Sequence, residues 1–333
     1  MILKDLGLRG QSILRLADLT DEQLLGLVSL AEQLKIHKRT LENLNQPLLR
    51  GRNICLIFEK GSTRTHSATV VAVNDEGGSA EYMNSHDLHF GKKESIKDSA
   101  RVLGRMFDGI MFRGFAQKTV EDLAKYSGIP VWNGLTDDWH PSQILADFQT
   151  MHEHFGRLKG LTVAFIGDGR NNVANSMMVG CAKAGINFID VCPPELSPSQ
   201  AVLDLAGEAA KRNGSWIHVE HDPIKGVKGA NVLYTDVWVS MGEEALFNER
   251  LKLLRPYQVN MEMVHNTGFD SPKDVIFLHC LPAFHNNETE VSRECGALEV
   301  SDELFESEFS KVFDEAENRM HTIKAMMVAT LMR

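Results

Sequence analysis

Residues 53–68 read NICLIFEKGSTRTHSA, a short apolar run followed at once by hydroxyl, arginine and histidine side chains. The run Asn53–Phe58 has the length and apolar composition of a buried strand. Serine and threonine directly after a strand predict the start of a helix, where one hydroxyl satisfies the exposed N–H groups. The stretch therefore predicts a strand followed by a helix, the repeating unit of a parallel sheet.

The same alternation of short apolar runs and helical-period segments recurs along the chain. The further runs are residues 79–83, 109–112 and 130–133, then 161–167, 187–191, 216–219, 231–236 and 275–280. Two such series predict an α/β protein with two domains, each a parallel sheet flanked by helices. Because Pro141 suits a first helical turn, a helix from Pro141 to about Phe155 is predicted to connect them.

A long terminal helix is expected from Glu315, since apolar residues recur at helical spacing and acidic residues occupy its first turn. We place the first domain at residues 1–150 and the second at 151–312. The last segment, 313–333, is the helix that returns to the first domain.

Composition narrows the class of protein. With 333 residues, 43% hydrophobic and 24% charged, the chain has the composition of a globular protein large enough for two domains. A net charge of −10 argues against a nucleic-acid surface, and no segment reaches the apolar length of a signal peptide or a membrane span. We expect a cytoplasmic protein whose five scattered cysteines are reduced.

The hydroxyls after Phe58 exceed what a helix cap needs. Ser62, Thr63, Arg64 and Thr65 put hydroxyls, helix N–H groups and a guanidinium at one positive helix end, which suits a phosphate group. Other predicted strands also end in polar loops, and ligands of parallel sheets bind at the carboxyl ends of strands. We expect these loops to line one cleft between the domains.

The stretch GDGRNN, residues 167–172, resembles a dinucleotide fingerprint, with Asp190 at the distance expected of a ribose-binding acid. The third glycine is absent, because Asn172 occupies that position. The Asn172 amide can instead bind both an amine and a carboxylate, as an amino-acid ligand requires.

Arg113 ends a predicted strand and Arg319 lies inside the terminal helix, so each could be a structural ion-pairing residue. If they join Arg64 at one site, three guanidinium groups could neutralise a phosphate dianion and its leaving-group charge. His140 and Gln143 are three residues apart at a helix start, where they can direct donors at one carbonyl group.

Cys280 follows His279 at a strand end, and a thiol–histidine nucleophile is one alternative. Adjacent strand residues point to opposite faces, which argues against it. Leu281 and the following proline turn the chain and expose carbonyl groups. Asp236 is the carboxylate best placed to hold a substrate ammonium, and Ser240 and Met241 follow it with N–H groups for a carboxylate. We expect no metal ion.

The motifs STRT, FRG, HPSQ, DVWVSMG and HCLP occur in this order, and with them the chain closely resembles the ornithine carbamoyltransferases, nearly end to end. STRT with HPxQ is shared across the carbamoyltransferase superfamily, whereas DVWVSMG with HCLP marks the ornithine branch. Aspartate carbamoyltransferases have a proline-and-arginine loop where this chain has HCLP.

The resemblance implies an enzyme that transfers the carbamoyl group of carbamoyl phosphate to the δ-amine of L-ornithine, in arginine metabolism and without a cofactor. The implied carbamoyl-phosphate residues are Ser62, Thr63, Arg64, Thr65, His89, Arg113, His140, Gln143, Cys280, Leu281 and Arg319. The implied ornithine residues are Asn172, Asp236, Ser240 and Met241. Of these, Asp236, Cys280, Arg113 and His140 carry the catalytic roles.

The resemblance also implies a homotrimer, or an assembly of trimers, because in this family the loop that contains His89 reaches the phosphate site of a neighbouring subunit. Two residues depart from the family pattern: His66 replaces an arginine after STRT, and His89 replaces a glutamine. We predict that carbamoyl-phosphate affinity, or the response to phosphate-mimicking inhibitors, varies between about pH 6 and 8.

Two other functions stay open on the sequence alone. One is a homologue that keeps the cleft but uses another amine substrate, or has a binding or regulatory role after losing turnover through these two changes. Citrulline production would distinguish it from the ornithine enzyme. The other is a nicotinamide-dependent dehydrogenase, which nicotinamide binding would reveal.

Overall fold

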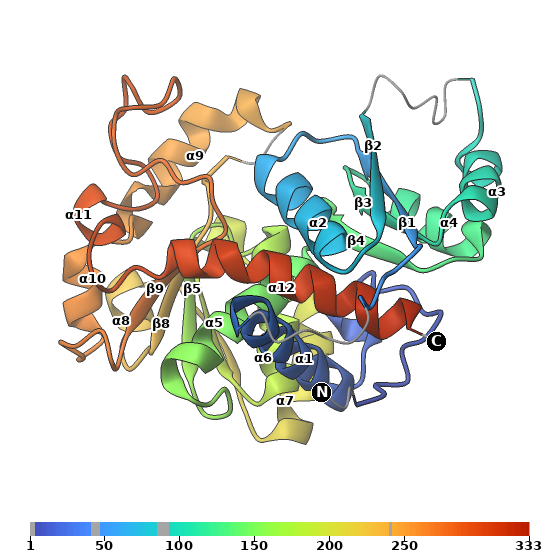
Figure 1. Cartoon of the computed structure of the whole chain (residues 1–333). Helices are drawn as coiled ribbons and strands as arrows, with labels where there is room; N and C mark the ends of the chain where they lie inside the picture. The colour runs from blue at the N-terminus through green and yellow to red at the C-terminus, as the bar shows by residue number, and fades with distance from the viewer. Residues whose placement is uncertain (1–3, 41–46, 85–92, 240–241, 333) are drawn as a thin grey trace. The chain divides into compact units, whose positions relative to one another are not determined.

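A computed structural model of the chain describes residues 4–40, 47–84, 93–239 and 242–332 (Figure 1). The chain forms two compact units. Unit 1 contains Met1–Gln149 and Glu317–Arg333, and unit 2 contains Thr150–Ala316. Two helices, α5 (Pro141–Phe155) and α12 (Val312–Leu331), continue from one unit into the other.

In the described part of unit 1 the sheet has four strands, β1 (Asn53–Phe58), β2 (Ser79–Asn84), β3 (Gly109–Arg113) and β4 (Val131–Leu135). Its order is β2-β1-β3-β4, and all neighbouring strands are parallel. After its first residue β1 is buried throughout, as expected of a central strand covered on both faces.

Helices pack against both faces of this sheet. The helices that lie wholly in unit 1 are α1 (Asp21–Thr40), α2 (Thr63–Asp75), α3 (Ile96–Met106) and α4 (Gln117–Ser127), with a 3-10 turn at Leu16–Asp18. Cys55 and Ile57 of β1 share one apolar cluster with Leu103 of α3 and Leu123 of α4. Successive strand residues point to opposite faces, so the residues between them serve the other layer.

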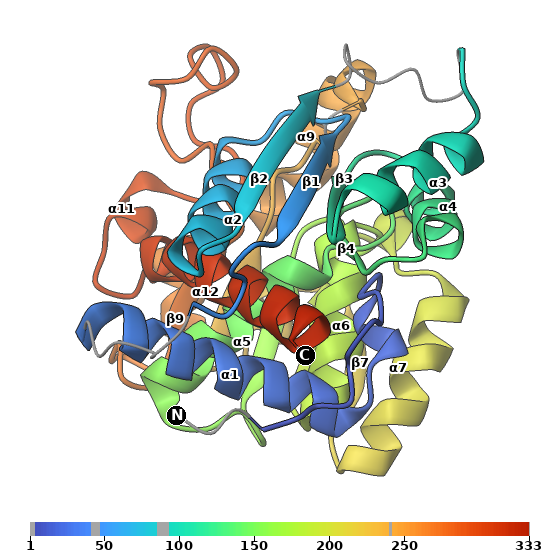
Figure 2. The ribbon, with the colours of Figure 1, turned by 45° about the vertical axis from the view of Figure 1, so that its right-hand side comes forward.

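The terminal helix packs against the first unit, as predicted (Figure 2). Its contacts reach α1, where Lys35 Nζ donates to Asn318 Oδ1 at 2.7 Å, and α2, where buried Lys324 lies 2.9 Å from Asp75. A further contact, through Arg319, reaches the first turn of α5. The end of the chain is therefore part of the structure that holds α2 and α5.

Unit 2 contains a sheet of five strands, β5 (Thr162–Ile166), β6 (Asn187–Val191), β7 (Ile217–Glu220), β8 (Val232–Thr235) and β9 (Ile276–His279). All neighbours are parallel in the order β7-β6-β5-β8-β9. The predicted class, two parallel sheets flanked by helices, is thus confirmed.

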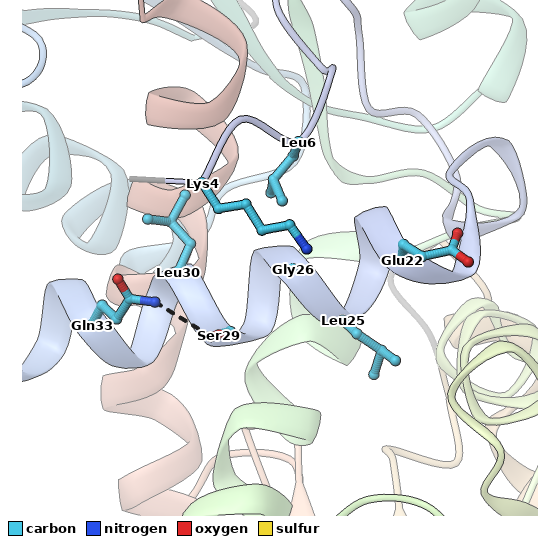
Figure 3. A pocket seen from close by; sticks show the side chains of 8 residues that line it. All are labelled: Lys4, Leu6, Glu22, Leu25, Gly26, Ser29, Leu30 and Gln33. Carbon is cyan, nitrogen blue, oxygen red and sulfur yellow. Dashed lines mark hydrogen bonds between the residues drawn. The ribbon is translucent and has the colours of Figure 1, made fainter. Parts of the chain in front are cut away.

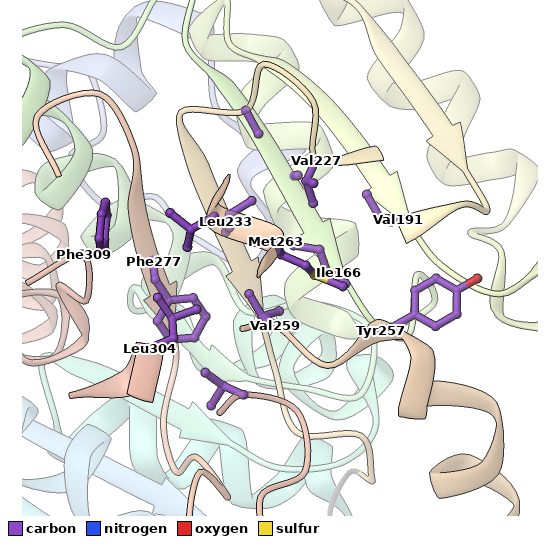
Figure 4. Close-up of a cluster of buried hydrophobic side chains, with 14 of the residues drawn as sticks. Ile166, Val191, Val227, Leu233, Tyr257, Val259, Met263, Phe277, Leu304 and Phe309 are labelled. Carbon is purple, nitrogen blue, oxygen red and sulfur yellow. The ribbon is translucent and has the colours of Figure 1, made fainter. Parts of the chain in front are cut away.

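One face of this sheet forms the large apolar core of unit 2 (Figure 4). Ile166, Leu233 and Phe277 from three strands meet Met263 and Leu304 from two short helices. The helices of the unit are α6 (Asn172–Ala184), α7 (Gln200–Asn213), α8 (Pro223–Gly226), α9 (Phe247–Leu254), α10 (Met261–Asn266) and α11 (Asp302–Phe305), with 3-10 turns at Pro194–Leu196, Glu244–Leu246 and Arg255–Tyr257. Within the described residues, none of the helices has both the length and the apolar composition of a membrane span.

Candidate active site

Strand order locates the binding edge of each sheet. In unit 1 the order reverses between β1 and β3, and in unit 2 it reverses between β5 and β8. Ligands of open parallel sheets bind outside the carboxyl ends of the strands at such a reversal. Arg113 is the last residue of β3, and residues 59–62, residues 167–171 and Asp236 follow the other three strands. All of them belong to segments selected from the sequence.

The start of α2 carries the serine and threonine cluster. Ser62 is the N-cap, and its Oγ accepts a hydrogen bond from Thr65 N at 3.2 Å. Thr63 begins the helix and is exposed, whereas Thr65 is buried. The predicted helix start is confirmed, and its remaining N–H groups and positive dipole end suit an anion.

Arg319 brings distant parts of unit 1 together. Its guanidinium is buried, and it donates to Gln143 Oε1 at 2.5 Å, to Thr65 Oγ1 at 3.0 Å and to Ser142 Oγ at 3.4 Å. Arg113, at the end of β3, donates to the same Thr65 hydroxyl at 3.4 Å. Two of the three predicted arginines therefore converge on α2, which sequence spacing could not establish.

His140 lies next to this arginine. Its Nε2 is 3.5 Å from Arg319 Nη1 and its Nδ1 is 3.5 Å from Ser142 Oγ. Burial, and then the positive charges of Arg319, Arg113 and Arg64, hold the pKa of His140 well below its ordinary value. The imidazole is thus neutral at physiological pH, and the field around it is positive. Such a site favours a dianion and offers a neutral ring to a polar group.

In unit 2, Asp236 follows β8 and accepts three hydrogen bonds. Asn171 Nδ2 donates to its Oδ2 at 2.9 Å, while Val237 N at 2.8 Å and Cys280 Sγ at 3.0 Å donate to its Oδ1. Asn171 is also the N-cap of α6, since its Oδ1 accepts from Val173 N. Asn172, predicted from the sequence as a ligand-binding amide, is the first residue of α6. The contact of Asn171 with Asp236 was not predicted, because sequence spacing does not show which residues 65 positions apart meet.

The HCLP turn fixes the side chain of His279. Leu281 has a φ of +51°, a backbone conformation that residues other than glycine rarely adopt. Its N–H donates to His279 Nδ1 at 2.9 Å. The other ring nitrogen, Nε2, lies 3.2 Å from Glu299 Oε1. Both nitrogens are thus engaged, which speaks against His279 as a base for the Cys280 thiol.

Two buried carboxylates support this turn, and sequence reasoning missed both. Glu299 also accepts from Phe284 N at 2.7 Å, and Glu315 accepts from His279 N and from the Tyr234 hydroxyl. Both residues are fully buried. They hold the strand ends that carry Asp236 and Cys280 in place.

The GDGRNN loop covers Asp190, the acidic residue that would bind the ribose in a dinucleotide site. Asp190 is fully buried, and a Cβ on Gly169 would lie 2.5 Å from its Oδ2 and 2.9 Å from the Leu196 carbonyl oxygen. Gly169 is needed for this close approach. Because Asp190 cannot reach a ribose in this structure, the nicotinamide alternative loses its acidic residue.

Asp190 gives a testable pH dependence of stability. Burial, and then the Asp168 carboxylate, raise the pKa of Asp190 well above its ordinary value. Its stabilising contribution is therefore full below the unfolded pKa of about 4 and is lost as the pH rises towards the folded pKa. Asp190→Asn should gain stability relative to the wild type by about 1 kcal/mol per pH unit above about pH 4.

Urea unfolding from about pH 4.5 to 8 measures this difference. The exposed Asp204→Asn on α7 serves as the control, and its difference from the wild type should stay flat. A constant difference for Asp190→Asn across the range would show that Asp190 is not protonated in the folded protein.

Three of the predicted residues, His89, Ser240 and Met241, lie outside the described residues. His66 is half-buried, and its ring packs against Tyr82 at 4.3 Å and near Phe58 at 6.2 Å between centroids. The pH effects predicted for His66 and His89 stay predictions.

Two groups of side chains in the described residues could offer three ligand atoms to a metal ion. They are Asp236, His279 and Cys280, and His285, Asp302 and Glu306, with atoms within 4.8 Å of one another. Hydrogen bonds already account for the His279 nitrogens and for the Cys280 contact with Asp236, and His285 Nδ1 lies 2.5 Å from Asp302 Oδ1.

A pocket of about 360 Å³ lies elsewhere in unit 1, along α1 (Figure 3). Its lining is Lys4, Leu6, Glu22, Leu25, Gly26, Ser29, Leu30 and Gln33. Among the residues that the structure describes, none of those selected from the sequence lines it, so this pocket is separate from the described part of the candidate site.

Comparison with known proteins assigns the two halves of the chain. Residues 11–153 match the carbamoyl-P binding domain of aspartate/ornithine carbamoyltransferases, and residues 159–330 match their Asp/Orn binding domain. The chain belongs to the aspartate/ornithine carbamoyltransferase family. Its members are transferases, and this chain is one of them.

Individual family members resemble the whole chain. The catabolic ornithine carbamoyltransferase of Bacillus licheniformis is 54% identical over 332 residues and covers 98% of both chains. That of Streptococcus gordonii is 53% identical over 97% of this chain and 96% of its own. The ornithine carbamoyltransferase structure from Pyrococcus furiosus superposes with a TM-score of 0.89 at 41% identity, over 97% of this chain and 98% of its own. The predicted resemblance to the ornithine carbamoyltransferases is confirmed.

Proposed function

We propose that this family member transfers the carbamoyl group of carbamoyl phosphate to the δ-amine of L-ornithine, giving L-citrulline and phosphate. The observation that carries the proposal is the positive site of unit 1, where Arg319 and Arg113 meet at Thr65 beside a neutral, buried His140. Because this site is positively charged, it favours a ligand with the two negative charges of a phosphate dianion.

The phosphate and carbamoyl groups would use different donors. Ser62, Thr63 and Thr65, with Arg64 and Arg319, would hold the phosphate at the start of α2. Arg113, His140 and Gln143 would hold the carbamoyl carbonyl and the bridging oxygen, and Cys280 and Leu281 would contact the carbamoyl end. His89 would complete the phosphate site from a neighbouring subunit.

Ornithine would bind through its α-carbon groups. The Asp236 carboxylate, oriented by Asn171 and by Val237 N, would hold the α-ammonium group. Asn172 would bind both α-groups, and Ser240 and Met241 would bind the α-carboxylate. Because these residues would bind only the two α-groups, the δ-amine of ornithine stays available to attack the carbamoyl carbon.

In the reaction, carbamoyl phosphate binds first and the neutral δ-amine then attacks its carbonyl carbon. The new C–N bond forms as the bond from carbon to the bridging oxygen breaks, the electron pair leaves with phosphate, and the N–H proton that the attacking amine gives up ends on that phosphate. Arg64, Arg113 and His140 would stabilise the oxyanion and the departing charge through fixed donors and positioning. An amine has a pKa near 10, so Asp236 and Cys280 would steer the proton that it loses. No cofactor enters the reaction.

We also propose a cytoplasmic homotrimer, or an assembly of trimers with shared active sites, that works in arginine metabolism. The relatives from Bacillus licheniformis and Streptococcus gordonii are called catabolic, which favours a role in arginine breakdown. The chemistry is reversible, and the same residues would serve both directions.

An amine panel tests the proposed reaction. With carbamoyl phosphate, kcat/KM for ornithine should exceed that for N-acetylornithine or putrescine by at least about 100-fold, because Asp236 needs a free α-ammonium group. Colorimetric detection of the ureido product measures it. Equal rates with putrescine would contradict the ornithine assignment, and tight binding of both substrates without product would favour the regulatory homologue.

A further inference from the structure

Arg250 is a buried arginine of unit 2 that lies between two acidic side chains. It belongs to α9, and only 4% of its surface is exposed. Its Nη1 lies 2.8 Å from Asp168 Oδ2, and its Nη2 lies 3.5 Å from Glu243 Oε1. Asp168 belongs to the loop after β5, and Glu243 belongs to the segment after β8. One side chain thus bridges the two segments at the strand-order reversal.

These are the segments that carry the proposed ornithine residues. Asn172 follows Asp168 in the first segment, and Asp236 precedes Glu243 in the second. The hydrogen bond from Asn171 to Asp236 links the same two segments a second time. A shift of either segment would therefore change the distance between Asn172 and Asp236.

The chemistry of Arg250 fits a positioning role better than a simple contribution to stability. Its guanidinium forms ion pairs with two carboxylates at once through two nitrogens held in one plane, an arrangement that a lysine ammonium does not offer. Buried ion pairs contribute little net stability compared with apolar side chains of similar volume, and their best attested use is to fix one arrangement. The Asp168 and Arg250 side chains are 12% and 5% exposed, so this pair is such a case.

We propose that Arg250 is a positioning residue for ornithine: it holds the loop of Asp168 and Asn172 at the distance from Asp236 that the α-groups of the amino acid require. The proposal rests on the proposed function. It places no contact between Arg250 and the substrate, and it assigns Arg250 no part in binding carbamoyl phosphate.

Steady-state kinetics of Arg250→Met test this role. The KM for ornithine should rise about 10- to 100-fold, because small misplacements of binding groups have effects of this size. The KM for carbamoyl phosphate should stay within about two-fold, since its proposed phosphate site lies in unit 1. Arg250→Lys should fall between the wild type and Arg250→Met. The control is Lys252→Met on the exposed side of the same helix, with both constants unchanged.

A merely structural arginine would give a different pattern. If Arg250→Met kept the ornithine KM of the wild type, or raised both KM values equally, the proposal would be overturned. Should Arg250→Met fail to fold, Glu243→Gln breaks only the more exposed contact, and a rise of about two- to five-fold in the ornithine KM is expected. An unchanged ornithine KM in Glu243→Gln would then overturn it.

Calorimetric binding of L-norvaline in the presence of saturating carbamoyl phosphate separates this inference from the proposed function. Norvaline has the α-amino and α-carboxylate groups of ornithine and lacks the δ-amine, so its binding does not depend on turnover. If the wild type made no citrulline, the proposed function would fail. Weaker norvaline binding by Arg250→Met than by the wild type would still support the positioning role, and equal binding would overturn it.

Discussion

Arg319→Met is expected to lower kcat/KM for carbamoyl phosphate by about 1,000-fold. Removal of a single donor from a charge-stabilising site costs about 100- to 1,000-fold, and Arg319 also orients three other groups. Without the guanidinium, Gln143 Oε1 and the Thr65 hydroxyl each lose the hydrogen bond from Arg319, and the site loses one positive charge. The KM for ornithine should change far less, because its proposed residues lie in unit 2.

A histidine titration by NMR gives this variant a second readout. Because Arg319 lowers the pKa of His140, its removal should move that pKa back towards the ordinary value. Arg39→Met is the matched control. The exposed Arg39 of α1 forms an ion pair at 2.9 Å with Glu317, which lies on α12 two residues before Arg319. Loss of activity in both variants, with an unchanged His140 titration, would mean that Arg319 acts only through the packing of α12.

Asp236→Asn should lower kcat/KM for ornithine by about 100- to 1,000-fold. Loss of one partner from a buried charge pair costs about 2–5 kcal/mol, and the asparagine keeps the volume of the side chain while removing its charge. The amide oxygen can keep the Val237 N and Cys280 contacts, whereas the hydrogen bond from Asn171 is lost because the amide nitrogen cannot accept it. Because the side chain keeps its volume and two of its three contacts, the fold should be retained. The KM for carbamoyl phosphate should remain close to the wild-type value.

Steady-state kinetics with both substrates varied will separate the two constants for Asp236→Asn. The exposed Asp270→Asn of unit 2 controls for a lost surface carboxylate and should behave like the wild type. If Asp236→Asn bound ornithine normally but turned over slowly, Asp236 would act in proton transfer alone, and its proposed role in holding the ammonium would be wrong.

The fold could be predicted because its elements are short, apolar and punctuated by polar residues. The helix Pro141–Phe155 has the bounds that its first proline and helical period predicted. The terminal helix begins at Val312, three residues before the predicted Glu315. Val312 is fully buried and Phe313 packs edge-on against Phe305, so tertiary contacts extend the helix beyond its acidic first turn.

Only those residues of the site that lie at the ends of strands could be predicted from the sequence. A polar residue after a strand indicates the edge of the sheet, and Asp236, Arg113 and the start of α2 lie there as expected. The partners of these residues come from elsewhere in the chain. Glu299 and Glu315 reach His279 from 20 and 36 residues away, without a periodic signal that marks them. Arg319 of α12 was a candidate on the sequence, with an ion pair as the alternative, and only the structure shows that it meets the Thr65 hydroxyl.

Transfer of a labelled carbon tests the central claim most directly. With [13C]carbamoyl phosphate and ornithine, 13C NMR should show the label entering the ureido group of citrulline, with one phosphate released for each citrulline formed. The reaction should occur only in the presence of the protein. Decay of the labelled carbamoyl phosphate at its uncatalysed rate, with ornithine unchanged, would contradict the assignment of this chain as an ornithine carbamoyltransferase.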